Sequence, residues 1–138
     1  MSEIDLLFGD TKRVADWVSD KTGVHDFGPE PTAIGILQDG ILIAGAVYHT
    51  FRSGNIDLTF AAQDDRWRTP KVLRALFYYP FVQAKCRRLT CVVPAADEMA
   101  QRVCIELGFV QEARCRQVFG PIDGIVFGML SEECQWIR

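Results

Sequence analysis

Four basic side chains surround a Thr-Pro pair in the stretch DDRWRTPKVLR, residues 64–74. Thr69 is a typical N-cap, and Pro70 suits the first helical position, where its missing N–H is not needed, so the stretch predicts the start of a helix. The amino end of a helix offers free N–H groups and the positive end of the helix dipole. Charge-assisted hydrogen bonds could come in addition from Arg66, Arg68, Lys71 and Arg74. The stretch therefore predicts a site for an anion such as a phosphate group.

The same four side chains also fit a simpler interpretation, a solvated basic face partly neutralised by Asp64 and Asp65. The two interpretations make different structural demands. An anion site requires Pro70 to lie beside a cleft between strands, with Arg66 and Arg68 free of internal carboxylate pairs.

The elements before this stretch are a helix and three strands. A helix is expected at about residues 10–22, capped by Asp10, and a loop rich in Gly and Pro follows over 22–32. The runs TAIGILQ and ILIAGAVYHT are joined by Asp39-Gly40, a dipeptide suited to a two-residue hairpin because both positions tolerate positive φ. After the turn RSGN, the run IDLTFAA alternates apolar and polar residues as a half-buried strand does.

The elements after it alternate between helix and strand. Helical spacing of apolar residues runs from Pro70 to Ala84, with a kink expected at Pro80. RRLTCVV is then a strand, ADEMAQRVCIEL a helix ended by Gly108, and FVQEARCRQVF and GIVFGML are two final strands. The strand-helix-strand unit in the middle makes its two strands parallel, so we expect a mixed sheet with helices on its faces.

Composition limits the class of protein. The chain has 138 residues, 49% of them apolar, which suits one domain over residues 1–138. No apolar run approaches the ~20 residues that cross a bilayer, and the amino terminus lacks the features of a secretory signal, so we expect a cytoplasmic protein without membrane contact. The five cysteines form no metal-ligand spacing and are expected to be reduced and mostly buried. A net charge of -3 argues against nucleic acid as the partner.

The order of elements, together with CIELGFVQEARCR after TCVVPAAD, resembles the GCN5-related N-acetyltransferase (GNAT) superfamily over about residues 32–130. The late signature of that family has the spacing of Asp97, Ala100, Cys104, Gly108 and Phe109, and three of the five residue types match. RALFYYPFVQAKCRRLTCVV and the ending GMLSEECQW are similar to small acetyltransferase-like proteins of phages and prophages. A phage origin would place the protein in the host cell cytoplasm.

This resemblance implies an α/β, three-layer fold with a mostly antiparallel sheet of about six to seven strands. It also implies acetyl-CoA bound where two central parallel strands splay apart, its pyrophosphate on the amino end of the intervening helix. The residues that would contact this coenzyme A thioester are Phe60, Ala61, Arg66, Trp67, Arg68, Thr69, Lys71, Val72, Arg74 and Asp97. The phosphate loop of the family keeps its first Arg here as Arg66, but Thr69 and Lys71 replace two small residues and Pro70 removes one N–H donor. Basic side chains would have to compensate.

Acetyl transfer to an amine needs a base for the amine, a donor that polarises the carbonyl and an acid for the leaving thiolate. The acid of many relatives is a Tyr, and Cys104 stands in its place here, either as a thiol acid or as a packing residue; Tyr78 and Tyr79 are possible substitutes. Asp57 and His49 are the candidate bases, on neighbouring strands that could bring them together. A main-chain N–H near Phe60 or Ala61 would polarise the carbonyl.

Three functions remain open at this point. The first is N-acetyl transfer from acetyl-CoA to a primary amine of a small molecule or a protein, with the acceptor between segments 22–32, which holds His25 beside Asp26, and 117–124. The second is a catalytically degenerate member of the fold that serves as a phage structural or host-binding protein. The third is a nucleic-acid regulator using the basic loop, an exposed Trp67 and the cluster Lys85, Arg87 and Arg88. Trp136 and Ile137 could cover a sheet edge or form a homodimer contact.

Overall fold

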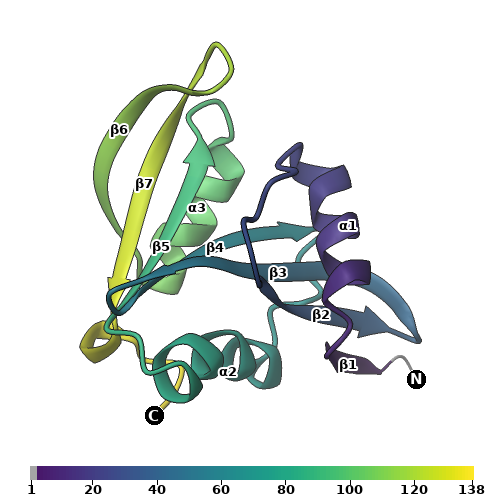
Figure 1. Ribbon diagram of the computed structural model, residues 1–138. Coiled ribbons are helices and arrows are strands. Elements are labelled where there is room, and N and C mark those ends of the chain that lie inside the picture. The colour runs from purple at the N-terminus through teal and green to yellow at the C-terminus, as the bar shows by residue number, and fades with distance from the viewer. Residues whose placement is uncertain (1–2) are drawn as a thin grey trace.

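The computed structural model describes residues 3–138 and contains one seven-stranded sheet with three α-helices (Figure 1). The strands lie in the order β1-β2-β3-β4-β5-β7-β6. In chain order the elements are β1 (Ile4–Phe8), α1 (Thr11–Thr22), β2 (Thr32–Gln38), β3 (Ile41–Arg52), β4 (Asn55–Ala62), α2 (Pro70–Tyr78), β5 (Arg88–Pro94), α3 (Glu98–Leu107), β6 (Val110–Phe119) and β7 (Ile122–Leu130). The expected mixed sheet with helices on both faces is confirmed, and β1 is an additional edge strand that the sequence patterns missed.

Within residues 3–138 one pair of strands is parallel, β4 and β5, and it separates soon after it begins. The two strands pair only where Asn55–Asp57 lies beside Arg88–Thr90. Beyond that point β4 continues to Ala62 and β5 to Pro94, and Figure 1 shows them diverging, β4 running across the molecule and β5 rising away from it. The expected splay of the central parallel strands is therefore present, and we call this gap the fork.

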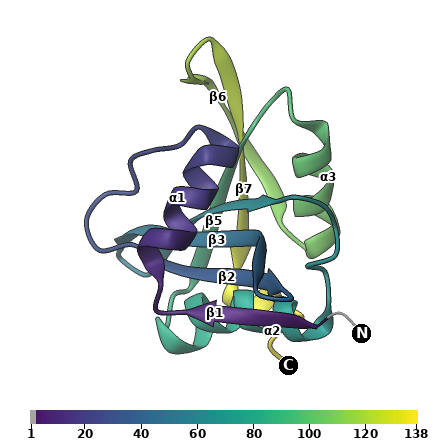
Figure 2. The ribbon, with the colours of Figure 1, turned by 90° about the vertical axis from the view of Figure 1, so that its right-hand side faces the viewer.

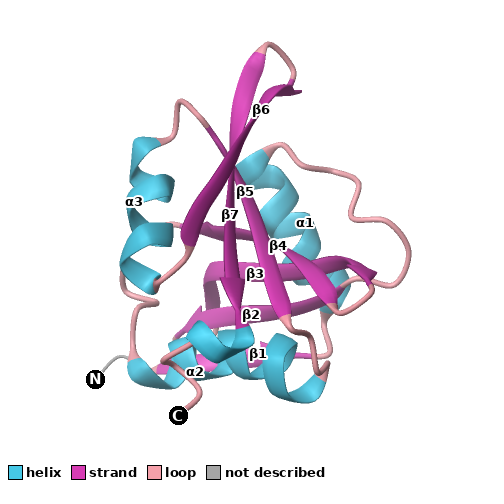
Figure 3. Ribbon diagram, turned by 90° about the vertical axis from the view of Figure 1, so that its left-hand side faces the viewer, coloured by secondary structure: helices cyan, strands magenta, loops and turns pink. Residues whose placement is uncertain are grey.

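Helices cover the two faces of the sheet unequally. On one face α1 packs over β2, β3 and β4, where Gly35 and Gly45 let it approach closely: a Cβ at Gly35 would lie 2.9 Å from Val14, and one at Gly45 2.8 Å from Val18. The main core lies on the opposite face, under α2 and α3. Figure 2 shows α1 and α3 on opposite sides of the strands, and Figure 3 shows β6 at the outer edge beside β7.

Local signals place most of the turns and caps. Asp39 and Gly40 both have positive φ, 51° and 84°, as the predicted two-residue hairpin requires. Thr69 accepts a hydrogen bond from the Val72 N–H at 3.3 Å, and Gly108 ends α3 in the left-handed conformation. Asp10 was expected to cap α1 but makes no side-chain capping bond.

Pro80 ends the regular part of the helix that begins at Pro70. The prediction of one kinked helix to Ala84 is wrong in detail, since α2 stops at Tyr78 and a π-helical turn follows over Tyr79–Gln83. Proline has no N–H to donate to the carbonyl four residues back, which is that of Leu76. The buried hydroxyl of Tyr48 donates to that oxygen instead, at 2.5 Å. A distant strand thus satisfies the group that Pro80 leaves unpaired.

Two further expectations concern cysteines and membranes. All five cysteines are free thiols, four of them buried, as predicted. Within residues 3–138 we find no helix whose length and apolar content would let it cross a bilayer.

Candidate functional site

The fork presents two strand edges without strand partners. β4 remains paired with β3 up to Ala62, and β5 with β7 up to Pro94, but the two do not pair with each other beyond Asp57 and Thr90. Alternate residues of 58–62 and 91–94 therefore aim N–H and C=O groups into the gap. Phe60 and Ala61 lie on this part of β4, as a carbonyl-polarising N–H would require. A ligand that carries amide groups could bind between these edges as an extra strand does.

The amino end of α2 offers fewer free amides than its position suggests. Pro70 has no N–H, Val72 donates to the Thr69 hydroxyl, and Leu73 donates to the Thr69 carbonyl at 2.9 Å. In the preceding loop, the N–H of Arg68 bonds to Asp65 and that of Thr69 to Trp67. Among the N–H groups of residues 68–73, only that of Lys71 has no hydrogen bond in the described part of the chain. Backbone donors alone would hold a phosphate weakly here.

Arg66 and Arg68 are paired with carboxylates, contrary to the demand stated for an anion site. Arg66 Nε lies 2.8 Å from Asp64 Oδ1, and its guanidinium also bonds the Gln38 side chain. Arg68 Nη1 lies 2.8 Å from Glu106 Oε1, so it links the loop before α2 to α3. The side chains of both pairs are partly exposed, and exposed ion pairs contribute little to stability. A phosphate could replace either carboxylate at small cost.

The other residues of the basic stretch face elsewhere. Lys71 Nζ lies 3.3 Å from the Ile4 carbonyl and 3.7 Å from Asp5. Arg74 lies over the Tyr78 ring, and these side chains line an open hollow of about 550 Å³ with Phe8. Because Ile4 is opposite Gln38, which Arg66 bonds, Lys71 and Arg66 meet at the same end of β1 and β2. Arg74 instead lines the hollow, and Arg68 pairs with Glu106 of α3.

Trp67 is buried, with 3% of its surface exposed, and its ring centroid lies 4.7 Å from that of Phe60 on β4. The expectation of an exposed aromatic for stacking on bases is therefore wrong. Val72 is also in the core, so only its backbone could face a ligand. Asp97 caps α3 by accepting from the Ala100 N–H at 3.0 Å. Trp136 packs on the core and donates to the Leu107 carbonyl, which favours a covering role over a dimer contact.

The two candidate bases lie side by side on the face away from α2 and α3. His49 on β3 and Asp57 on β4 are directly opposite in the antiparallel register. His49 Nε2 contacts the Thr59 hydroxyl at 2.8 Å, and the Phe27 ring meets the imidazole edge-on at 5.2 Å. Burial lowers the pKa of His49 below its usual value, with Asp57 acting weakly in the other direction. A neutral imidazole at neutral pH follows, which is the form that can accept a proton.

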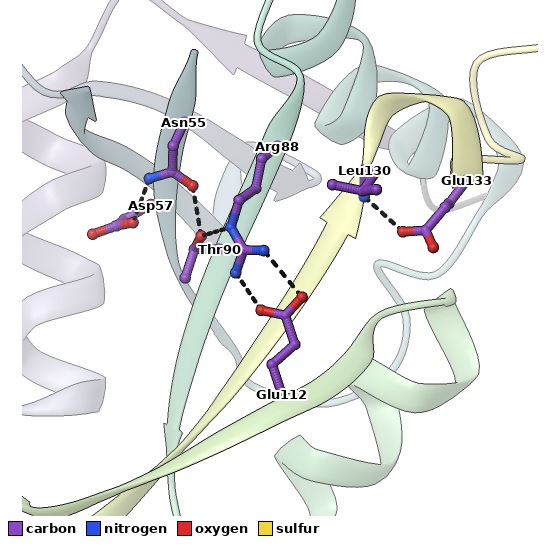
Figure 4. A network of polar contacts seen from close by, with 7 residues as sticks. All are labelled: Asn55, Asp57, Arg88, Thr90, Glu112, Leu130 and Glu133. Carbon is purple, nitrogen blue, oxygen red and sulfur yellow. Dashed lines mark hydrogen bonds and ion pairs between the residues drawn. The ribbon is translucent and has the colours of Figure 1, made fainter. Parts of the chain in front are cut away.

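A polar network lies at the closed end of the fork (Figure 4). Thr90 donates to Asn55 at 2.6 Å, Asn55 donates to Asp57 at 3.2 Å, and the Arg88 Nε donates to Thr90 at 2.8 Å. Arg88 also holds Glu112 of β6 in a two-bond ion pair. The sequence patterns did not indicate this network, because it joins residues of β4, β5 and β6 that are far apart along the chain.

Gly128 makes room for the Arg88–Glu112 pair. A Cβ at this position of β7 would lie 2.6 Å from Glu112 Oε2 and 2.7 Å from Arg88 Nη2. The pair therefore crosses β7 directly over its backbone. Hydrogen bonding to Arg88 lowers the pKa of Glu112, and Glu112 raises that of Arg88, so both stay charged.

Cys104 on α3 lies beside Cys91, the first residue of β5 beyond the parallel pairing. A hydrogen bond from the Cys91 thiol to the Cys104 sulfur lowers the pKa of Cys104 and raises that of Cys91. Both side chains are buried in the core on the α2–α3 face. Tyr79 packs against Tyr48 with ring centroids 4.9 Å apart, and Tyr78 lines the hollow outside α2. Cys104 lies next to the closed end of the fork through Cys91, and Tyr79 approaches it through Tyr48, which is opposite Leu58 of β4.

Comparisons with solved structures agree with this architecture. A protein named only as a probable acetyltransferase matches with a TM-score of 0.65 at 18% identity, over 76% of this chain and 63% of that chain. The spermidine/spermine N-acetyltransferase SpeG from Vibrio cholerae, in mutant form, matches with a TM-score of 0.75 at 10% identity, over 94% of this chain and 96% of that one. A dodecameric structure of the spermidine N-acetyltransferase from the same organism matches with a TM-score of 0.73 at 11% identity, over 95% and 94%.

These likenesses show the fold: the chain has the fold of the GNAT acetyltransferases, as the late signature and the order of elements predicted. A comparison with protein-family models found no match, and a search of curated proteins found none either.

Proposed function

We propose that this protein is an N-acetyltransferase that moves the acetyl group of acetyl-CoA to a primary amine. The observation that carries the proposal is the fork: two strand edges without strand partners beyond Asp57 and Thr90, in a sheet that carries His49 and Asp57 on one face and α2 on the other. The thioester supplies an activated acetyl group, and the amide-bearing arm of the cofactor suits the unpaired edges. The proposal includes a cytoplasmic location, in the host cell if a phage encodes the chain.

In this proposal, different residues of the chain bind different parts of acetyl-CoA. Arg66 and Arg68 exchange Asp64 and Glu106 for the diphosphate, next to the Lys71 N–H and the loop backbone at Trp67 and Thr69. The backbone of Phe60 or Ala61 polarises the carbonyl. Val72, Arg74 and Asp97 stay as further candidate contacts from the family resemblance, and Arg74 would first have to leave the Tyr78 ring.

Groups at the closed end of the fork transfer the protons in this proposal. Asp57 or neutral His49 accepts the proton of the attacking amine as the N–C bond forms and the C–S bond breaks. Cys104, whose pKa is lowered by Cys91, returns a proton to the departing thiolate. Direct attack of this kind needs no covalent acyl-enzyme.

Thermal unfolding with and without acetyl-CoA tests the binding step. At 100 times its dissociation constant, a ligand that binds only the native state adds about 2.7 kcal/mol. For 138 residues the entropy of unfolding is about 0.3 kcal/mol per kelvin, so Tm should rise by about 9 °C. Arg68→Gln should weaken binding about tenfold by removing a charged hydrogen bond, whereas Arg13→Gln on α1 should change nothing. An unchanged Tm at millimolar acetyl-CoA would contradict the proposal.

A second candidate is a non-catalytic member of this fold, such as a phage structural or host-binding protein. The amino end of α2, with its single free amide at Lys71, is the observation that favours it. Release of free CoA thiol from acetyl-CoA over a panel of amines separates the two. Binding without any release, for every amine, supports the second candidate.

A further inference from the structure

The face of the sheet that carries Asp57 is left uncovered beyond the fork. α1 packs over β2–β4, and in Figure 1 the strands β5, β7 and β6 rise beside it rather than beneath it. Apolar side chains are exposed in this region: Val92 by 36%, Val118 by 52% and Ile122 by 42%. Apolar groups held in water on a sheet face are unfavourable unless something covers them.

Two of these side chains, Val92 and Val118, converge with Phe119 on one bare stretch of backbone. A Cβ at Gly124 of β7 would lie 2.5 Å from Val118 Cγ1, 2.9 Å from Val92 Cγ1 and 3.1 Å from Phe119 Cε2. Residues of β5 and β6 thus meet over a glycine that has no side chain of its own. We call Val92, Val118 and Phe119 around Gly124 the apolar patch.

The patch and the polar network lie on one line along β5. Thr90 and Val92 point to the same face, two residues apart, which separates them by about 7 Å. Thr90 is bonded to Asn55, which in turn bonds Asp57. A molecule of modest size could therefore place one end at Asp57 and the other on the patch.

Near the fork, Asp57 offers a carboxylate to a cation. Asp57 forms no ion pair within residues 3–138, whereas Glu112, the next carboxylate on this face, is held by both guanidinium nitrogens of Arg88. A polyamine would bring a second ammonium group to the region of the patch, where it would meet valine and phenylalanine side chains. Removing an ammonium group from water without a partner is costly.

We propose that the acceptor is a small monoamine with an aliphatic or aromatic body, its ammonium group at Asp57 and its body on the apolar patch. The inference rests on the proposed function, since it names the acceptor of that reaction. The acetyl group and the amine would then reach the fork from opposite faces of the sheet, the thioester from the side of α2 and α3 and the amine from the uncovered side.

The first test compares amines as acceptors. We expect kcat/KM for 2-phenylethylamine and hexylamine to exceed that for spermidine and for ethylamine at least tenfold. Val118→Asp should lower kcat/KM for 2-phenylethylamine at least tenfold and leave ethylamine unchanged. Ile105→Asp, which alters an exposed apolar residue of α3, is the matched control and should change neither. A preference for spermidine, or a Val118→Asp enzyme equal to the control, overturns the inference.

The second test needs no turnover and keeps the two proposals apart. In methyl NMR of the intact protein, 2-phenylethylamine should shift the Val92 and Val118 signals at concentrations where spermidine does not. Shifts in a protein whose Tm does not respond to acetyl-CoA would mean that the surface is right and the proposed reaction wrong. A response to acetyl-CoA without any methyl shifts would mean the reverse.

Discussion

The bond between Tyr48 and Leu76 allows a sharp test of how α2 is held. Tyr48→Phe removes only the hydroxyl, which donates at 2.5 Å to a carbonyl that Pro80 cannot serve. Tyr48 is fully buried, so water cannot take the place of the lost donor without opening the core. An unsatisfied buried carbonyl costs about 1–3 kcal/mol. With an unfolding entropy of about 0.3 kcal/mol per kelvin, a loss of about 2 kcal/mol lowers Tm by about 7 °C.

The assay is urea unfolding followed by tryptophan fluorescence, with Tm from circular dichroism. Tyr79→Phe is the matched control, because the Tyr79 ring packs on Tyr48, whereas within residues 3–138 the hydroxyl bond to Leu76 belongs to Tyr48. We expect that variant to change stability by less than about 0.5 kcal/mol.

A double-mutant cycle with Pro80→Ala tests whether the Tyr48 hydroxyl matters because Pro80 has no N–H for the Leu76 carbonyl. Alanine restores an N–H that can reach the Leu76 carbonyl, so the hydroxyl of Tyr48 should matter less in that background, by about 1 kcal/mol. Equal costs of Tyr48→Phe in both backgrounds, or a cost no larger than that of the Tyr79 control, would refute the reasoning.

Three further predictions concern packing, pH and the leaving group. Gly35→Ala should destabilise the protein by about 1–3 kcal/mol in urea unfolding, because the new Cβ would lie 2.8 Å from Leu42 in the core; full stability would show that this contact relaxes freely. The pKa of His49 is lowered in the folded state, so its contribution to stability is complete above the unfolded pKa of about 6.5 and is lost as the pH falls below that value. NMR titration of the ring should therefore give a midpoint under about 6.5, and a higher midpoint would contradict the burial argument. Cys104→Ser should lower kcat at least tenfold while the Tm response to acetyl-CoA persists, and Cys86→Ser should leave both unchanged; equal rates in the two variants would remove Cys104 as the acid.

The elements could be predicted from short stretches of sequence, with β1 as the exception. Six strands and three helices follow from alternation, helical spacing and turn residues that act within a few positions. Ile4–Phe8 is a five-residue edge strand whose side chains are partly or fully exposed, so it carries only a weak alternation. Its existence depends on pairing with β2, about 30 residues away along the chain, as in Phe8 opposite Ile34.

The candidate site could be predicted in part. The splayed parallel pair follows from the order of elements, and His49 and Asp57 face each other because a tight turn sets the register of β3 and β4. The long-range partners of Arg68 and Arg88 could not be predicted. Arg68 meets Glu106 only because α2 and α3 lie on the same face, and Arg88 meets Glu112 only because β7 inserts between β5 and β6.

By itself, then, the sequence determined the type and order of six strands and three helices, that the central strands run parallel, and which residue types stand at the helix start. Tertiary structure alone decided that Arg68 pairs with Glu106, that Trp67 is buried, and that Gly124 and Gly128 open one sheet face to an apolar patch and a polar network. The physical reason is the separation along the chain over which each interaction acts. Capping, turn formation and hydrophobic periodicity act over a few residues, whereas an ion pair or a buried ring depends on which distant segments the packed core brings together.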